Sequence, residues 1–228
     1  MEGGFTVPRP AYSSEIEPSL PRSLAPSLAA KPPTPMRQAT IARKTQETDI
    51  SVTWNLDQAA PSAISTGIGF FDHMLEAFAK HSGTGLAVSC KGDLHIDGHH
   101  TSEDVGIALG QALRQALGER IGIERFGHIA VPLDEALVSA TLDISGRGYL
   151  VYELHPPAGL IGTWDTELVR EFFGGFTENA KVCLHLHQLQ GRNSHHIVEA
   201  GFKAFARAIR QALKITGTDV PSTKGVLA

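Results

Sequence analysis

The sequence has few cysteines, no long apolar run and no excess of positive charge. Cys90 and Cys183 are its only cysteines among 228 residues, and neither belongs to a paired-cysteine motif, which argues against zinc-finger chemistry. We expect both to be reduced core residues of a cytoplasmic protein. No apolar stretch approaches the roughly 20 residues that cross a bilayer. A net charge of −4 and a pI near 6.2 argue against nucleic acid as a partner, so we expect neither nucleic acid nor membrane binding.

Residues 1–35 are rich in proline, serine and alanine and have no periodic apolar pattern. Such a segment cannot bury enough surface to offset the entropy of ordering, so we predict a disordered N-terminal extension. A transit peptide is disfavoured by Glu2, Glu15 and Glu17 and by the scarcity of arginine. An alternative is a start codon misassigned upstream of Met36, where a more structured text begins.

Two similar motifs occur at 98–104 and 193–199, each with adjacent histidines and a glutamate four residues after the first of them. If each motif opens a helix, that glutamate and the first histidine share one face and can grip one divalent ion. These pairs are His99 with Glu103 and His195 with Glu199. The second histidines, His100 and His196, point about 100° away on a 3.6-residue helix and would serve a second ion.

The repeat extends beyond the histidines, because a sequence similar to that at 112–117 recurs at 208–213 with the same offset of 96 residues. A chain of this length can form one large domain or two small ones of about 100 residues each. The repeat favours two similar halves, which we place at 36–127 and 128–228.

Periodicity predicts the elements of each half. Alternation over 39–54, which includes Glu47, predicts a pair of strands, and an apolar stripe over 67–83 predicts a helix that carries His73. Glu171 follows His73 by 98 residues and so occupies roughly its equivalent position. Further strands are expected at 86–94, 128–131, 136–144, 149–154 and 182–189. Further helices are expected at 102–117, after a cap at Asp165, and after the second motif up to Thr216 and Gly217.

Two other segments have chemistry suited to an anion. Arg147 lies between glycines in the turn at 145–148, where its guanidinium can approach an anion with little steric obstruction. The C-terminal tail offers the hydroxyl of Ser222 and the ammonium of Lys224, which suit phosphate.

Four motifs in this order resemble the imidazoleglycerol-phosphate dehydratase family of histidine biosynthesis. They are Phe-Phe-Asp-His-Met-Leu at 70–75, Asp-Gly-His-His-Thr-Ser-Glu-Asp at 97–104, Gly-Arg-Asn-Ser-His-His-Ile-Val-Glu-Ala at 191–200 and Ser-Thr-Lys-Gly-Val-Leu at 222–227. The resemblance runs from about residue 36 to the C-terminus. It implies an α+β fold made by tandem duplication of a β-β-β-α-β-α unit, with ribosomal protein S5 domain 2-like halves and sheets packed against helices.

The resemblance also implies an activity and an assembly. The activity is a metal-dependent dehydratase that converts D-erythro-imidazole glycerol phosphate to imidazole acetol phosphate and water. Two Mn²⁺ ions per subunit are implied, and so is a homo-oligomer of 24 subunits with active sites between chains.

Site residues are also carried over from the resemblance. The implied metal ligands are His73, His99, His100, Glu103, Glu171, His195, His196 and Glu199. The implied catalytic residues are Glu47, as the acid or base for proton transfer, together with His73, Glu103 and Glu199, and the implied phosphate ligands are Arg125, Arg147, Ser222 and Lys224. Many relatives have histidine where this chain has Glu171.

Eight ligands shared by two ions leave octahedral ions with open positions for substrate. We expect each His/Glu pair to share its ion with a histidine of the other motif, as a hypothesis. A metal-dependent hydrolase and a metal-storage protein are the alternatives. A zinc deaminase would need a Pro-Cys-x-x-Cys motif that the sequence lacks.

Overall fold

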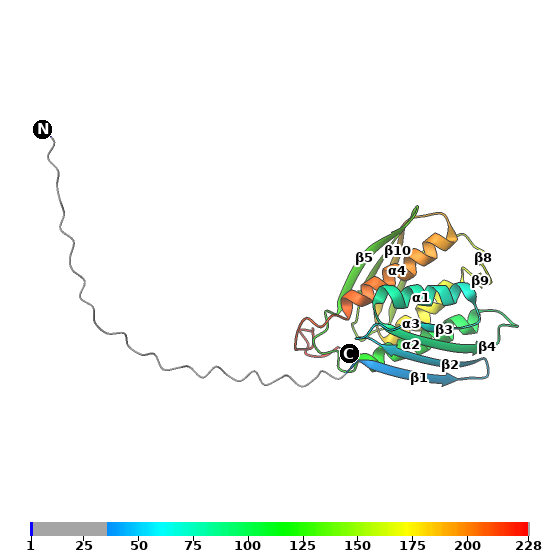
Figure 1. Cartoon of the computed structure of the whole chain (residues 1–228), viewed down its shortest axis with the longest axis horizontal. Helices are drawn as coiled ribbons and strands as arrows, with labels where there is room; N and C mark the ends of the chain where they lie inside the picture. Colours follow the sequence, from blue (N-terminus) through cyan, green and yellow to red (C-terminus); the bar gives the residue numbers. More distant parts are fainter. Residues whose placement is uncertain (2–35, 228) are drawn as a thin grey trace. The chain divides into compact units, whose positions relative to one another are not determined.

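The computed structural model describes Met1 and residues 36–227, so the predicted extension lies outside the described residues (Figure 1). The first half contains β1 (Gln38–Lys44), β2 (Thr48–Asn55), β3 (Ala63–Ser65), α1 (Gly69–Ser82), β4 (Gly85–Gly92) and α2 (His99–Leu117). The second half contains β5 (Phe126–Leu133), β6 (Ala136–Asp143), β7 (Tyr149–Glu153), α3 (Leu168–Ala180), β10 (Cys183–Gln190) and α4 (Ser194–Ala212). A small hairpin of β8 (Leu160–Ile161) and β9 (Trp164–Asp165) is inserted before α3.

The two halves have the same sheet topology. Their strand orders are β1-β2-β4-β3 and β5-β6-β10-β7, and in both sheets the last pair is parallel while the others are antiparallel. The predicted α+β fold and its duplicated β-β-β-α-β-α unit are therefore confirmed. Strand β5 begins at Phe126, two residues before the start that we placed at 128.

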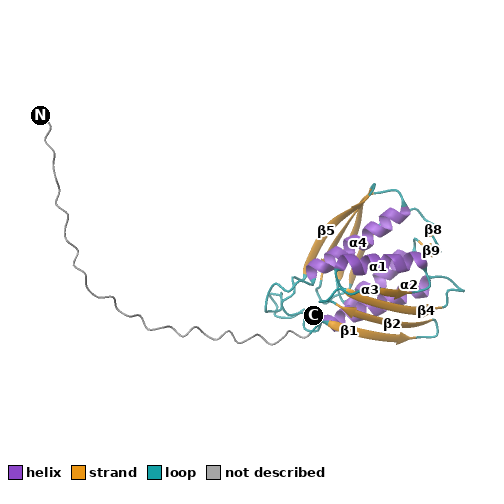
Figure 2. Ribbon diagram, in the orientation of Figure 1, coloured by secondary structure: helices purple, strands orange, loops and turns teal. Residues whose placement is uncertain are grey.

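The helices lie between the two sheets (Figure 2). Helix α2 packs on β1 and β2, α4 packs on β5 and β6, and the helices contact one another in the pairs α1–α4 and α2–α3. Alternate residues of β2 are buried because a strand presents successive side chains to opposite faces, and Ile50, Val52 and Trp54 point to the helices. An aromatic cluster fills the centre, where Phe202 lies against Trp164 and Phe172.

Glycines allow α2 and α3 to approach closely. A Cβ atom on Gly106 would lie 2.3 Å from the carbonyl oxygen of Phe172, and one on Gly110 would lie 2.5 Å from that of Phe176. A Cβ atom on Gly175 of α3 would lie 2.7 Å from the carbonyl oxygen of Glu103. Helix backbones can meet at this distance only where the side chain is missing, so these glycines set how α3 lies beside the first histidine motif.

Three sequence predictions about helix ends were wrong. Helix α2 begins at His99 rather than 102, so both histidines lie in its first turn. Asp165 does not cap α3; it ends β9, and its carboxylate accepts a hydrogen bond from the backbone of Glu167. Helix α4 ends at Ala212, because the chain at Thr216 is held by backbone bonds to Gly122.

Short edge strands were not predicted either. Strand β3 and the hairpin of β8 and β9 are two or three residues long, too short for an alternating pattern to be visible. Across residues 36–227, every helix is too short or too polar to traverse a bilayer.

Candidate active site

One cluster of potential metal ligands is formed where α1 and α4 pack together. His73 of α1 joins His195 and Glu199 of α4, and one ligand atom from each lies within 4.8 Å of the others. The Oε2 atom of Glu199 is 2.9 Å from Nε2 of His195 and 3.6 Å from Nε2 of His73. His195 and Glu199 thus lie together as their four-residue spacing predicts, and the third member of this cluster is His73 of α1.

Lys203 holds the second oxygen of the Glu199 carboxylate. Its Nζ atom is 2.7 Å from Oε1, one helical turn further along α4. Burial raises the pKa of Glu199, but the bonds from Lys203 and His195 outweigh it and leave the pKa below its ordinary value. Glu199 is therefore ionised near neutral pH. Lys203 was not among the predicted site residues, although its i,i+4 spacing from Glu199 indicates this contact.

The equivalent residues of the first motif are less closely gathered. His99 and Glu103 share a face of α2, with Nε2 and Oε2 3.8 Å apart. Glu171 lies in the first turn of α3, the helix that packs on α2, and its Oε1 atom is 3.5 Å from Nη1 of Arg170. Glu171 lies on the helix that packs on α2, and His73 lies on the helix that packs on α4. The two residues therefore hold equivalent places in the two halves, in agreement with the repeat offset. Within residues 36–227, however, the cluster on α1 and α4 is the only group of three such residues whose ligand atoms all lie within 4.8 Å of one another.

His100 turns away from His99 towards the end of β4. Its Nδ1 atom is 3.0 Å from Oδ2 of Asp93, and its Nε2 atom is 3.7 Å from Oε1 of Glu47 in the turn between β1 and β2. The bond to Asp93 is the main cause that raises the pKa of His100. The structure thus brings the predicted acid or base, Glu47, beside a predicted metal ligand.

His196 makes the corresponding contacts in the second half. Its Nδ1 atom is 2.7 Å from Oε2 of Glu135, and its Nε2 atom is 3.6 Å from Oδ2 of Asp134, both in the turn between β5 and β6. This bond raises the pKa of His196 and is the main cause that lowers the pKa of Glu135 to about 2. Asp93, Asp134 and Glu135 were missed, because single carboxylates at strand ends carry no periodic signal.

Asp104 ends the first motif but is structural. Its Oδ2 atom accepts a hydrogen bond of 2.6 Å from Thr48 and pairs at 2.5 Å with Nη1 of Arg43. These contacts attach α2 to β1 and β2, and so they position the first turn of α2, which carries His99 and His100, relative to the sheet.

The predicted phosphate ligands lie elsewhere in the chain. Arg125 donates to both oxygens of Asp143, at 2.7 and 3.1 Å, and to the carbonyl of Pro221 at 2.9 Å. The tail folds on itself there, with the backbone N–H of Lys224 donating to the hydroxyl of Ser222. A pocket with a volume of about 360 Å³ joins this tail to the turn that carries Arg147, through Gly146 and Gly225.

These phosphate residues are far from the histidines of the same chain. The tail follows the C-terminal end of α4 and contacts the segment just after α2, where Gly122 donates to the carbonyl of Asp219 and Arg120 to that of Leu227. The histidines lie at the N-terminal ends of the same helices. Each helix has 19 residues and is therefore about 28 Å long at 1.5 Å per residue. A single copy does not bring the predicted phosphate residues and the histidine cluster together.

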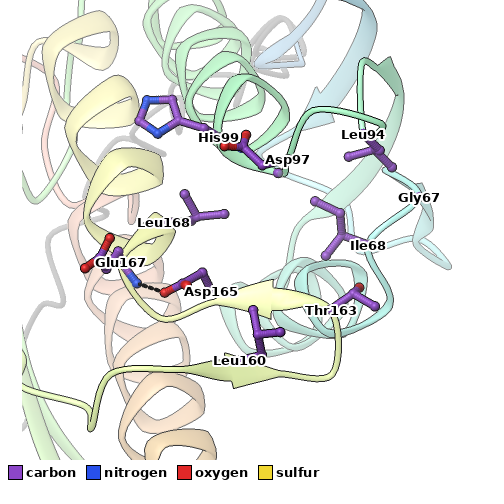
Figure 3. A pocket seen from close by; sticks show the side chains of 11 residues that line it. Gly67, Ile68, Leu94, Asp97, His99, Leu160, Thr163, Asp165, Glu167 and Leu168 are labelled. Atoms are coloured by element: carbon purple, nitrogen blue, oxygen red, sulfur yellow. Dashed lines mark hydrogen bonds between the residues drawn. The ribbon is translucent and has the colours of Figure 1, made fainter.

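A second pocket, of about 490 Å³, opens beside His99 (Figure 3). Its walls are mixed, with the apolar side chains of Ile68, Leu94 and Leu168 and of Leu160 in the β8–β9 hairpin (Figure 3). Asp97, Asp165 and Glu167 add carboxylates. It provides a concave surface next to one predicted metal ligand.

Known proteins share this sequence and architecture. The family model described as imidazoleglycerol-phosphate dehydratase matches residues 66–209. The dehydratase of Synechococcus sp. (strain WH7803) is 57% identical over 195 residues, covering 84% of this chain and 96% of that one. That of Jannaschia sp. (strain CCS1) is 55% identical over 195 residues, covering 84% and 100%.

Solved structures agree with these relatives. The enzyme from Pyrococcus furiosus, determined in complex with (S)-C348, superposes with a TM-score of 0.73 at 40% identity and covers 82% of this chain and 100% of that one. The enzyme from Staphylococcus aureus gives 0.72 at 38% identity, covering 78% and 99%.

The duplicated α+β fold and these relatives define an enzyme of the hydro-lyase class, which removes water from its substrate. Within that class, the chain belongs to the imidazoleglycerol-phosphate dehydratase family of histidine biosynthesis.

Proposed function

We propose that this chain converts D-erythro-imidazole glycerol phosphate to imidazole acetol phosphate and water, using two Mn²⁺ ions per subunit. The observation that carries the proposal is the meeting of two imidazoles and an ionised carboxylate at His73, His195 and Glu199. Neutral imidazole and carboxylate are ligands that suit Mn²⁺ and related divalent metals, so the donor set fits the ion.

The ligands divide into two groups of three and two single histidines. One ion would be held by His73, His195 and Glu199, and the other by His99, Glu103 and Glu171, with Glu171 as the carboxylate equivalent of His73. A bound ion supplies positive charge that stabilises negative charge developing on the substrate. His100 and His196 turn out of both groups and would complete sites on neighbouring copies.

The side chains around these groups would handle the substrate's protons and its phosphate. The hydrogen that is lost from C2 is not adjacent to a carbonyl and is therefore barely acidic, so a positioned base is needed. Glu47, 3.7 Å from His100, is our candidate for that proton transfer. Arg147, Ser222 and Lys224 would bind the phosphate, and Arg125 would hold the tail in place through Pro221.

We further propose that the active sites lie between chains of a homo-oligomer of 24 subunits. The separation along helices of about 28 Å supports this, because phosphate residues of one copy cannot reach its own histidines. We also propose a cytoplasmic location, since Cys90 and Cys183 are free thiols and burial raises the pKa of Cys90 to about 11.

The test is a metal-dependent assay. The purified protein is stripped with chelator, Mn²⁺ is restored, and the enolisable ketone product is followed by ultraviolet absorbance. We expect activity to disappear and return with the metal. Release of inorganic phosphate instead of ketone formation would refute the dehydratase proposal and indicate a metal-dependent hydrolase.

Assembly is tested in the same samples by light scattering. We expect the stripped protein to lose both activity and part of its assembly, because His100 and His196 would then no longer link copies. A fully active monomer would contradict the proposal that sites form between chains.

A further inference from the structure

Each of the two single histidines is held by a carboxylate that no sequence motif pointed to. Asp93 is largely buried, with 13% of its side chain exposed, and its Oδ2 atom is 3.0 Å from Nδ1 of His100. Its backbone is also fixed, since its N–H donates to the carbonyl of Glu47 and its carbonyl accepts from Ile96. The Oδ1 atom of Asp93 has no hydrogen-bond partner among the described residues, so His100 is the contact that its carboxylate makes.

Glu135 does the same for His196, and it also holds the start of α4. Its Oε2 atom is 2.7 Å from Nδ1 of His196. Its Oε1 atom accepts from the backbone N–H groups of Arg192 and Asn193, at 3.2 and 2.8 Å. The carboxylate therefore fixes the histidine ring relative to the helix on which it sits.

These bonds determine which ring nitrogen is available. An ionised carboxylate can only accept, so Nδ1 of each imidazole must carry the proton. The neutral ring then presents an unprotonated Nε2 atom, which faces outward beside Glu47 in one half and Asp134 in the other. A metal-binding histidine commonly has its other nitrogen held in this way, because that bond sets both tautomer and orientation.

The two halves place this carboxylate at different positions. Glu135 immediately precedes β6, and the residue that immediately precedes β2 is Glu47. Asp93 immediately follows β4, and the residue that follows β10 is Gly191. A side chain at Gly191 is disfavoured, because its φ is +133° and a Cβ atom would lie 2.9 Å from Ile197. Both halves thus have two carboxylates at this histidine, one near each ring nitrogen. In the second half both come from the turn before β6, whereas in the first half Asp93 follows β4 and Glu47 precedes β2.

We propose that Asp93 and Glu135 are positioning residues that hold Nε2 of His100 and His196 ready to bind a metal ion, and that Asp93 leaves Glu47 free for proton transfer. Glu135, at the position equivalent to Glu47, is occupied by His196 and cannot take that role. The inference rests on the proposed function in that both histidines are taken to be metal ligands.

The first test measures Mn²⁺ affinity by equilibration in metal buffers and electron paramagnetic resonance. We expect Asp93→Ala to weaken binding of the ion that His100 serves by roughly 10- to 100-fold. Asp93→Asn should recover most of that loss, because its amide oxygen still accepts from Nδ1–H. The control is Asp49→Ala, which removes an exposed carboxylate paired with Lys44 on the same sheet and should bind Mn²⁺ as wild type does. Equal binding by Asp93→Ala and Asp49→Ala would overturn the proposal, as would an asparagine variant no better than the alanine one.

The second test uses metal-free protein and so separates this inference from the proposed function. In protein labelled with ¹⁵N-histidine, solid-state NMR distinguishes the two neutral tautomers, and the His100 signal is the one lost in His100→Gln. We expect the Nδ1–H tautomer in wild type and a mixture in Asp93→Ala. An unchanged tautomer in Asp93→Ala would overturn the positioning role. Absence of Mn²⁺ binding by wild type would instead overturn the proposed function, with the tautomer result still standing.

A matched pair of substitutions tests the division between the two equivalent glutamates. Glu47→Gln should retain Mn²⁺ and lose turnover by about 10²-fold or more, as expected for loss of a general acid or base. Glu135→Gln should mainly change Mn²⁺ affinity, by a few-fold. If turnover at saturating Mn²⁺ were lost only in Glu135→Gln, proton transfer would belong to Glu135 in the second half, and the proposed division between the two glutamates would be overturned.

Discussion

The close contact of α2 and α3 leads to a prediction in which two opposing effects can be compared. Gly106 lies inside a 19-residue helix, where alanine is favoured over glycine by about 1 kcal/mol on helix propensity alone. A Cβ atom there, however, would lie 2.3 Å from the carbonyl oxygen of Phe172 and 3.2 Å from the backbone nitrogen of Phe176. Both obstacles are backbone atoms of α3, so no side-chain rotation can relieve them.

To reach ordinary contact distance the two helices would have to separate by roughly 1 Å, since carbon atoms pack at about 3.5–4.0 Å. Overpacking of this kind costs typically 1–3 kcal/mol, which exceeds the gain in helix propensity over most of its range. The net effect is then about 0–2 kcal/mol, and we expect Gly106→Ala to lower the free energy of unfolding by up to about 2 kcal/mol. Because His99 and Glu103 lie about two turns and one turn before Gly106, we also expect turnover to fall by up to about 10²-fold for a displacement near 1 Å.

The matched control is Gly174→Ala on α3, the same substitution at a helical glycine with nothing within 4 Å of the added Cβ atom. It should raise the free energy of unfolding by about 0.5–1 kcal/mol. Urea unfolding followed by the fluorescence of the buried Trp54 and Trp164 measures both, at one protein concentration because assembly makes stability concentration-dependent. Equal stability of the two variants would refute the packing argument.

Three further predictions concern the core, pH and proton transfer. Phe202→Ala should lower the free energy of unfolding by about 3–5 kcal/mol, measured by urea unfolding, because a fully buried ring is removed from the aromatic cluster; a loss below 1 kcal/mol would contradict this. In metal-free protein the pair of Glu135 and His196 should stabilise the fold most between about pH 4.5 and 6.5. The pKa of Glu135 is lowered, so its contribution to folding stability is complete above its ordinary pKa of 4.5 and is lost as the pH falls towards about 2. The pKa of His196 is raised, so its contribution is complete below its ordinary pKa of 6.5 and is lost at higher pH. Melting temperatures of wild type and Glu135→Gln should therefore differ most in that window, and a constant difference from pH 3 to 9 would count against the pair. Glu47→Gln should keep wild-type stability, because the half-exposed carboxylate makes only a 3.7 Å contact, and thermal melting checks this.

The duplicated fold could be predicted because it depends on local patterns that occur twice. Alternation over 39–54 predicted β1 and β2, and the helical stripe through Phe71 and Phe78 predicted α1, since burial on one face imposes the period of the element. The partnership of His195 with Glu199 was also predictable, because one helical turn brings them together.

The third ligand and the carboxylates around the single histidines depend on the tertiary structure. His73 reaches His195 because α1 packs on α4, and Asp93 and Glu135 reach their histidines because strand ends meet helix starts in the folded chain. No periodic pattern reports such meetings between different elements, whether the residues are seven positions apart, as for Asp93 and His100, or 61, as for Glu135 and His196. The end of α4 was missed for the same reason, as Thr216 is held by Gly122.

By itself, then, the sequence determined the repeated architecture, the two histidine motifs and the family, because helix and strand periods and motif spacing are local properties of the chain. Only the tertiary structure decided that Lys203 bonds the Glu199 carboxylate, that Asp93 and Glu135 contact the remaining histidines, and that the predicted phosphate residues lie a helix length from the histidines of the same copy. Those relations arise from the packing of α1 on α4 and of α2 on α3, in which glycines without side chains set the closest approach.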